Sequence, residues 1–238
     1  MPRTARASAG GYCYHVLNRG NARGEVFHKA QDYDAFLDIL AEAGRRVPVR
    51  LIGYCLMPNH FHLVAWPRED GDLSRWMHWL ITAHVRRYLR HHGSSGHVWQ
   101  GRFKAFPIRE DEHLLTVLRY VERNALRAGL VDRAEHWRWS SLVPRPDGPA
   151  LDPGPTPRGT GWVEHVNAAM TEAEVEALAL AIRRDRPFGP EDWTRTTAER
   201  LGLLHAIRSR GRPKGMRRVD DRERGSKSKC SHSFGSVS

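Results

Sequence analysis

The sequence predicts an α+β fold of the ferredoxin-like type, with the order β-α-β-β-α-β-α over residues 12–143. Three observations predict it. Short β-branched and aromatic runs alternate with helical apolar stripes. A break at Met57-Pro58-Asn59 separates two neighbouring runs, as in a hairpin. Two βαβ-like halves flank that hairpin, so we expect helices on one sheet face and a second face free for a substrate or partner.

Four segments are predicted as strands. Residues 12–20 form the first and end in an Asn-Arg-Gly turn signal. Residues 49–56 and 60–66 form the hairpin, because the proline between them cannot donate to a ladder. Residues 97–109 form a fourth strand that is interrupted at Gly101.

Three helices follow from apolar residues at helical spacing. Residues 31–46 carry such a stripe, with Asp32 near the start as a capping residue. Residues 73–91 carry a broad apolar face with arginines on the remainder. Residues 111–128 form the third helix, which Gly129 closes.

The chain divides into five segments by composition. Residues 1–11 are predicted as a flexible N-terminus and 12–143 as the main domain. Pro and Gly make 144–161 a linker, and 162–205 a small helical extension. In that extension Thr171 and Glu174 form a capping box, and a further helix runs from Gly189-Pro190 to about Leu203. Residues 206–238 are a basic tail that is predicted to be disordered.

The charge balance favours a polyanionic partner. Lys and Arg total 38 against 27 acidic residues, a net charge of +11. No apolar run approaches the ~20 residues that span a bilayer, which predicts no membrane partner. The three cysteines lack CxxC spacing, which argues against a zinc framework and fits a reducing cytosol.

The sharpest local motif is His60-Phe61-His62. On a strand, residues i and i+2 point to the same face with Cα atoms ~6.5–7 Å apart, so both imidazoles can reach one metal ion. Phe61 then faces the helices. Alone, the motif is more typical of two partly exposed histidines on a sheet than of a metal site.

Tyr120 and Asn124 have i, i+4 spacing in the third helix and therefore share one face. Each taken singly is typical of a packing residue. Together with the histidines they indicate chemistry, because a phenol can attack a phosphodiester when a cation stabilises the charge on the phosphate. Two imidazole nitrogens and one amide oxygen leave open positions on Mg²⁺ or Mn²⁺. Glu122 and Asp111 are alternative ligands.

Three segments predict contacts to nucleic acid. The run Trp99-Gln100-Gly101-Arg102-Phe103-Lys104 interleaves basic and aromatic residues, which suits phosphate pairing and base stacking. Asn18-Arg19 is a weaker site of the same kind. In the tail, Arg210, Arg212 and Lys214 form an Arg-Gly-Arg-Pro-Lys run that can enter an A·T minor groove or attract any polyanion.

Four motifs in order give the sequence a specific resemblance. The stretches Y-H-V-L-N-R-G (14–20), G-Y-C-L-M-P-N-H-F-H-L-V (53–64), G-H-V-W-Q-G-R-F-K (96–104) and L-R-Y-V-E-R-N (118–124) resemble the bacterial REP-associated tyrosine transposases of the HUH single-tyrosine superfamily. The resemblance covers about residues 12–142. It also extends to R-P-F-G at 186–189 and G-R-P at 211–213.

The resemblance implies a ferredoxin-like catalytic domain that cleaves single-stranded DNA beside an imperfect palindromic hairpin with a divalent metal. The cut leaves a transient 5′-phosphotyrosine and a free 3′-hydroxyl. His60 and His62 match the paired histidines, Tyr120 the nucleophile and Asn124 the third ligand. Family members usually have Asn-Pro where this chain has Asn124-Ala125. We expect a cytoplasmic bacterial protein, associated with the nucleoid, that acts as a monomer or homodimer.

Three other functions fit the same residues. A replication initiator or relaxase uses the same chemistry, although the W-Q-G-R-F-K motif favours a transposase. A DNA-binding protein of this fold with little or no catalysis is a second alternative. A ribonuclease would use His60 and His62 as an acid/base pair and would cleave without a metal.

Overall fold

A four-stranded antiparallel sheet forms the centre of the computed structural model, which describes residues 8–143 and 145–208. The strands are β1 (Cys13–Arg19), β2 (Val49–Met57), β3 (His60–Pro67) and β4 (Lys104–Ile108), in the order β2-β3-β1-β4. β1 pairs with β3 and β4, and β3 pairs with β2, all antiparallel. This is the split βαβ order of a ferredoxin-like sheet, and the predicted fold class is confirmed.

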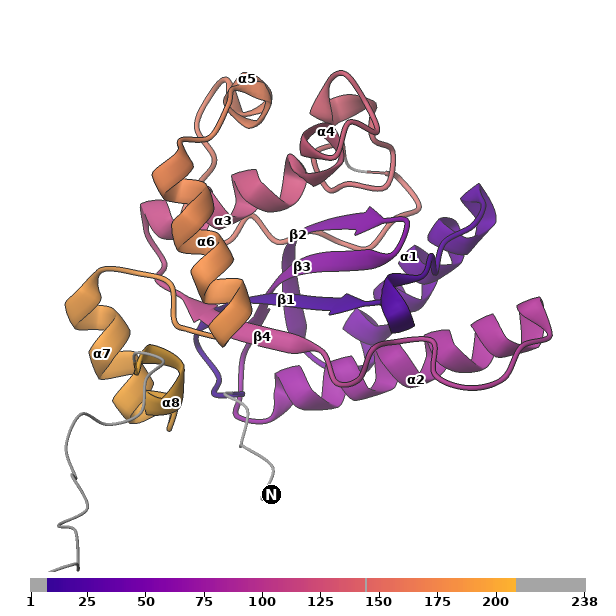
Figure 1. The fold of residues 1–238 in the computed structure, drawn as a ribbon, viewed down its shortest axis with the longest axis horizontal. Helices are drawn as coiled ribbons and strands as arrows, with labels where there is room; N and C mark the ends of the chain where they lie inside the picture. The colour runs from indigo at the N-terminus through magenta and orange to yellow at the C-terminus, as the bar shows by residue number, and fades with distance from the viewer. Residues whose placement is uncertain (1–7, 144, 209–238) are drawn as a thin grey trace, which may run out of the picture. The chain divides into compact units, whose positions relative to one another are not determined.

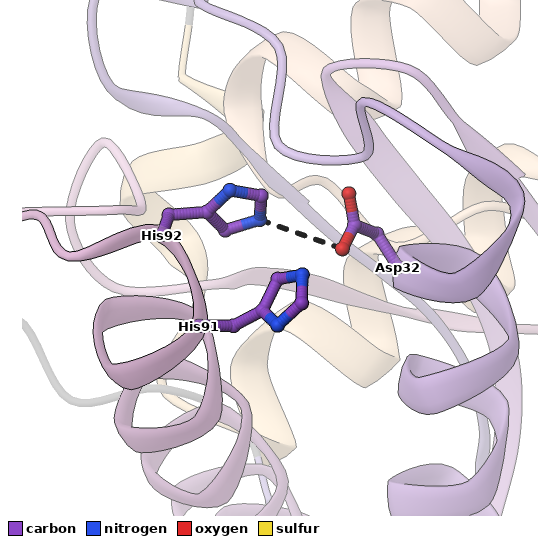
Figure 2. Close-up of side chains that lie close together, drawn as sticks. All are labelled: Asp32, His91 and His92. Atoms are coloured by element: carbon purple, nitrogen blue, oxygen red, sulfur yellow. Dashed lines mark ion pairs between the residues drawn. The ribbon is translucent and has the colours of Figure 1, made fainter.

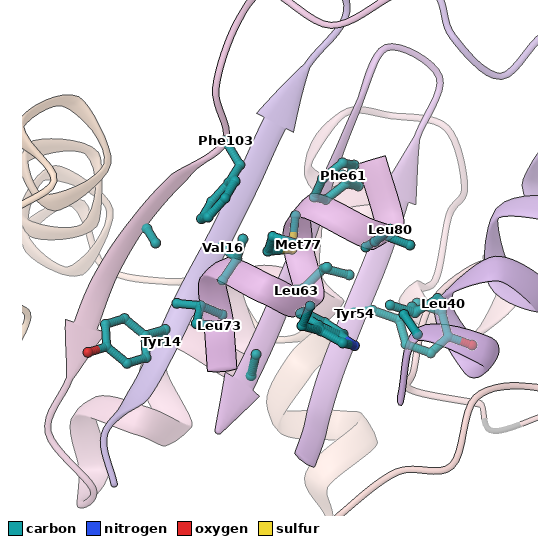
Figure 3. Packing of buried hydrophobic residues seen from close by; sticks show 14 of the residues in the cluster. Tyr14, Val16, Leu40, Tyr54, Phe61, Leu63, Leu73, Met77, Leu80 and Phe103 are labelled. Carbon is teal, nitrogen blue, oxygen red and sulfur yellow. The ribbon is translucent and has the colours of Figure 1, made fainter. Parts of the chain in front are cut away.

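Helices α1 (Ala30–Arg46) and α2 (Asp72–His92) cover one face of the sheet (Figure 1). Alternate residues of the strands point to this face, among them Val16, Phe61 and Leu63, and pack with Leu73 and Met77 of α2 (Figure 3). Phe61 and Leu63 therefore lie beneath the helices as their strand parity predicts. This cluster is the larger part of the core.

The opposite face is covered too, which corrects the expectation of helices on one face only. Helices α3 (Glu112–Glu122) and α4 (Asn124–Arg127) cross it, and α6 (Glu172–Arg184) lies against β4 (Figure 1). Ile52, Val64 and Phe106 of the strands pack there with Leu118 of α3 and Leu178 of α6. The sheet is buried on both sides because its residues of both parities are largely apolar.

The remaining elements are short and lie mostly in the C-terminal half. They are the 3-10 turns Asn21–Arg23 and Ala134–His136, and the helices α5 (Trp162–Asn167), α7 (Glu191–Arg200) and α8 (Leu204–Ile207). Thr171 caps α6 with Glu174 in the predicted capping box. Pro190 is the N-cap of α7 rather than its first helical residue.

Hydrogen bonds hold the described parts of two segments that we expected to be a flexible N-terminus and a linker. Residues 145–161 run beside β2: the Asp152 N–H donates to Leu51 O at 2.7 Å, and Arg158 donates to Ile52 O at 2.7 Å. At the N-terminus, Gly10 donates to Asp70 at 2.8 Å. Backbone groups that are buried against a neighbouring element form hydrogen bonds with it. The Pro/Gly composition of a segment does not indicate whether such a neighbour exists. Residues 8–208 belong to one compact unit.

The fourth strand begins seven residues later than predicted, at Lys104. Residues 97–103 instead form a loop that is held at the end of β1 by a bridge between Gly20 and Trp99 and by the Gln100 N–H, which donates to Arg19 O at 2.8 Å.

The predicted third helix is divided at Arg123 into α3 and α4, although Arg123 keeps near-helical angles. No described helix is long and apolar enough to cross a membrane.

Candidate active site

The two histidines of the motif stand on the face of the sheet that α3 covers. His60 and His62 of β3 have ring centroids 4.9 Å apart at an interplanar angle of 84°. His62 is 3% exposed, whereas His60 lies at the end of the strand and is half-buried. The predicted convergence of the two rings is present, because both residues have the same strand parity.

Tyr120 packs edge-on against His62, with ring centroids 5.8 Å apart. It projects from α3, whose apolar stripe buries Leu114, Leu118 and Val121 against the sheet. Asn124 lies one turn further on and is 2% exposed. Its Nδ2 donates to the Tyr120 carbonyl at 3.0 Å, so the amide is oriented with Oδ1 as its acceptor atom. Tyr120, Asn124 and the histidine pair are therefore neighbours within a single chain.

Asn59 determines the tautomer of His60. Its Nδ2 donates to Arg23 O at 3.0 Å, which leaves Oδ1 facing His60 Nδ1 at 2.6 Å. An amide oxygen only accepts, so the Nδ1 of His60 carries the hydrogen. The lone pair of a neutral His60 therefore resides on Nε2.

A third histidine, His15 of β1, determines which nitrogen of His62 is free. His15 is fully buried, and its Nε2 lies 2.8 Å from His62 Nδ1. Its register partner is Val64, so His62 is a diagonal neighbour across the ladder. Only Nε2 of His62 is left for another ligand. His15 was not predicted, and its one sequence signal is a histidine within an otherwise largely apolar strand.

Burial keeps these histidines neutral. It lowers the pKa of His15 to about 3, and together with the nearby charges of Arg19 and Arg127 it lowers the pKa of His60 to about 4. The pKa of His62 lies well below its usual value, first through burial and then through His60. A neutral imidazole has a lone pair for a metal ion. The donor set therefore fits a divalent cation at neutral pH.

Arg127 is a second residue that the sequence did not single out. Its exposed guanidinium lies 5.1 Å from the Tyr120 ring centroid and donates to the phenolic oxygen at 3.3 Å. The same Nη2 lies 3.5 Å from Asn124 Oδ1. A cation at the tyrosine oxygen stabilises negative charge there or on a phosphate bound beside it.

The alternative ligands Glu122 and Asp111 are occupied elsewhere. Glu122 is 1% exposed and accepts from Ser141 and Trp162, both at 2.7 Å. Burial raises its pKa. Asp111 caps α3 and accepts from the His113 N–H at 2.9 Å. The hydrogen bonds of both carboxylates are therefore made to residues other than His60 and His62.

The predicted stacking aromatics are core residues, which is a correction. Trp99 is 4% and Phe103 is 8% exposed, and both belong to the cluster under α1 and α2. The loop folds back because these two side chains, together with Val98, anchor it in the core. Gln100 and Arg102, between them, are exposed.

The polar residues of the predicted nucleic-acid sites differ in exposure and in hydrogen bonding. Asn18 is 6% exposed and donates to Gly101 O at 3.3 Å, whereas Arg19 is exposed beside His60. Lys104 donates to Ile182 O at 3.0 Å. An open hollow of ~350 Å³ is bordered by the polar residues Asn18, Arg19, Gln100, Arg102, Lys104 and Arg183. Arg210, Arg212 and Lys214 lie outside the described residues.

Comparisons with known proteins agree with the motifs. Residues 9–124 match the family model described as IS200-like transposase, and this span contains all four motifs. A Haemophilus influenzae protein assigned as a REP-associated tyrosine transposase is 28% identical over 106 residues, which cover 40% of this chain and 60% of the relative. The chain thus spans about 60% of the curated relative that it matches. The resemblance inferred from the motifs is confirmed.

Two solved structures are also similar. A REP-associated tyrosine transposase bound to a REP hairpin superposes with a TM-score of 0.48 and 17% identity, covering 64% of this chain and 99% of that chain. A Deinococcus radiodurans protein assigned as a transposase superposes with a TM-score of 0.36 and 18% identity, covering 54% and 92%.

Proposed function

We propose that this chain, whose residues 9–124 match the IS200-like transposase family, is a metal-dependent DNA endonuclease and strand transferase. One observation carries the proposal. Tyr120 packs against His62, 5.8 Å between ring centroids, within the same chain. A nucleophile, a pair of neutral imidazoles and a guanidinium are thereby brought to one place.

His60 and His62, through Nε2, and Asn124, through Oδ1, would hold the divalent metal. Mixed nitrogen and oxygen donors suit Mn²⁺ in affinity, and Mg²⁺ is the more abundant ion. The metal when bound supplies positive charge that stabilises the phosphate during displacement. Asn59 and His15 orient the two imidazoles by occupying their Nδ1 atoms.

Tyr120 is the proposed nucleophile. Its oxygen attacks the phosphorus, the bond to the 3′-oxygen breaks, and a 5′-phosphotyrosine and a free 3′-hydroxyl result. Arg127 donates to the phenolic oxygen at 3.3 Å, so its positive charge lies where the attacking oxygen would meet the phosphate. Because Tyr120 lies beside the histidines of its own chain, a monomer has a complete site.

The substrate is proposed to be single-stranded DNA that contains a hairpin. Arg19 and Arg102 are exposed near the site and would pair with phosphates. With the net charge of +11 this gives a salt-dependent affinity. We further propose that the protein acts in the bacterial cytoplasm on palindromic repeats of the nucleoid.

The test is cleavage of end-labelled single-stranded DNA that carries the palindromes flanking the gene, with Mn²⁺ or Mg²⁺, on a denaturing gel. We expect a covalent protein–DNA adduct that requires the metal and is lost in Tyr120→Phe. His60→Ala should abolish cleavage while hairpin affinity falls little. Tight hairpin binding without a cut would indicate a binding protein, and cleavage in EDTA would indicate a nuclease of another mechanism.

A further inference from the structure

Two helices bring three metal-ligand side chains together on the α1/α2 side of the sheet, away from Tyr120. Asp32 lies in the first turn of α1, and His91 and His92 form the end of α2 (Figure 2). One ligand atom from each lies within 4.8 Å of the other two. Three such atoms at that separation can reach one cation.

The carboxylate of Asp32 is held in a fixed orientation. Its side chain is 4% exposed, and Oδ2 accepts from the backbone N–H of His28 at 3.0 Å and of Lys29 at 3.3 Å. The other oxygen, Oδ1, faces His92 Nε2 at 3.4 Å. Ligating carboxylates are commonly oriented in this way by hydrogen bonds to their second oxygen.

His92 supplies a second observation. Its Nε2 is buried and makes no hydrogen bond within residues 8–143 and 145–208, and Asp32 Oδ1, 3.4 Å away, is an ion-pair partner only when the imidazole is protonated. When the imidazole is neutral, a buried nitrogen without a hydrogen bond is costly. A cation between Oδ1 and Nε2 would satisfy both atoms.

The neighbouring rings complete the site. Tyr88 and His28 lie beside the His92 ring, with centroids 4.4 Å and 5.1 Å away, and His28 Nε2 lies 3.0 Å from the Tyr88 hydroxyl. His91 is exposed. These rings cover one side of the three ligand atoms, and the side at His91 is open to water.

We propose that Asp32, His91 and His92 bind a divalent transition-metal ion of the Zn²⁺ class, which clips the first turn of α1 to the last turn of α2. Two imidazoles and one carboxylate favour Zn²⁺ or Co²⁺ over Mg²⁺ or Ca²⁺, and three protein ligands leave a position for water. The loop after His92 leads to Trp99, which bridges to Gly20 at the end of β1. The clip would therefore hold the start of the loop that carries Gln100 and Arg102. This inference is independent of the proposed nuclease activity.

The experiment uses the full chain carrying His60→Ala and His62→Ala, treated with a chelator and titrated with Co²⁺. We expect one equivalent of bound Co²⁺ with intense visible d–d absorption, displaced by Zn²⁺ but not by a large excess of Mg²⁺. Adding His91→Ala, an exposed position, should weaken Co²⁺ binding at least tenfold. Adding His78→Ala, an exposed histidine of the same helix, should leave it unchanged.

Thermal unfolding provides a second readout. A ligand that binds the folded state stabilises it. Zn²⁺ should therefore raise the Tm of the parent, the chain that carries His60→Ala and His62→Ala, and of the same chain with His78→Ala added. It should not raise the Tm when His91→Ala is added. The proposal is overturned if the parent shows no Co²⁺ absorption. It is equally overturned if His91→Ala binds Co²⁺ as tightly as His78→Ala, since the metal would then lie elsewhere.

Discussion

His15 gives the sharpest test of the proposed metal site. For His62 to offer a lone pair at Nε2, its Nδ1 must carry the hydrogen and donate it to His15 Nε2, 2.8 Å away. His15 must then be protonated at Nδ1, an atom that is buried without a partner among the described residues. The tautomers of both rings are thus linked across β1 and β3.

His15→Phe removes the acceptor and keeps a ring. Loss of such a partner typically costs about 10–100-fold in metal affinity, which corresponds to about 1.4–2.8 kcal/mol. His15→Gln places an amide oxygen the same number of bonds from the backbone as Nε2, so it can still accept the hydrogen of His62. We therefore expect its Mn²⁺ affinity to stay within about threefold of the unmodified chain, a much smaller loss than that of His15→Phe. Mn²⁺ affinity is measured from the free-ion signal in electron paramagnetic resonance.

His84→Phe is the matched control. His84 is 3% exposed and projects from α2 against Phe36 of α1, on the other face of the sheet. Both phenylalanine variants replace a buried histidine, and overpacking can cost about 1–3 kcal/mol of stability in either. Only His15→Phe should lose Mn²⁺ affinity. If a folded His15→Phe chain binds Mn²⁺ as tightly as His84→Phe, the linked-tautomer reasoning is refuted.

Four further predictions follow from individual contacts. Burial lowers the pKa of His84 to about 3, whereas the same imidazole in the unfolded chain takes up its proton below pH ~6.5. The free energy of unfolding therefore decreases as the pH falls between those two values. Urea unfolding at several pH values should show that this decrease is smaller in His84→Phe than in the unmodified chain, by up to ~1.4 kcal/mol per pH unit. Trp99→Ala should lower the free energy of unfolding by about 3–5 kcal/mol, because Trp99 is a core residue; a stable variant with selectively weaker DNA binding would contradict its burial. Arg102→Ala should leave stability unchanged and reduce the salt slope of DNA binding by about one ion, measured by fluorescence anisotropy at several salt concentrations. Arg127→Leu should slow single-turnover cleavage about 10²-fold or more while Mn²⁺ affinity stays within a few fold; an unchanged cleavage rate would remove Arg127 from the site.

Local periodicity determined most of the fold. Strand parity placed His60 and His62 on one face and Phe61 on the other, and the i, i+4 spacing placed Tyr120 beside Asn124. These relations follow from backbone geometry over a few residues. The sequence contains that geometry directly.

Contacts between distant segments were decided by tertiary structure. Strand pairing brings His15 to His62, 47 residues away, and no pattern within either strand contains this contact. Trp99 and Phe103 have the composition of a nucleic-acid surface, yet they are buried because the loop before β4 folds onto the core. Burial of both sheet faces likewise required α3 and α6 to be positioned. A side chain's exposure depends on which distant element covers it, and pattern within one segment cannot specify that neighbour.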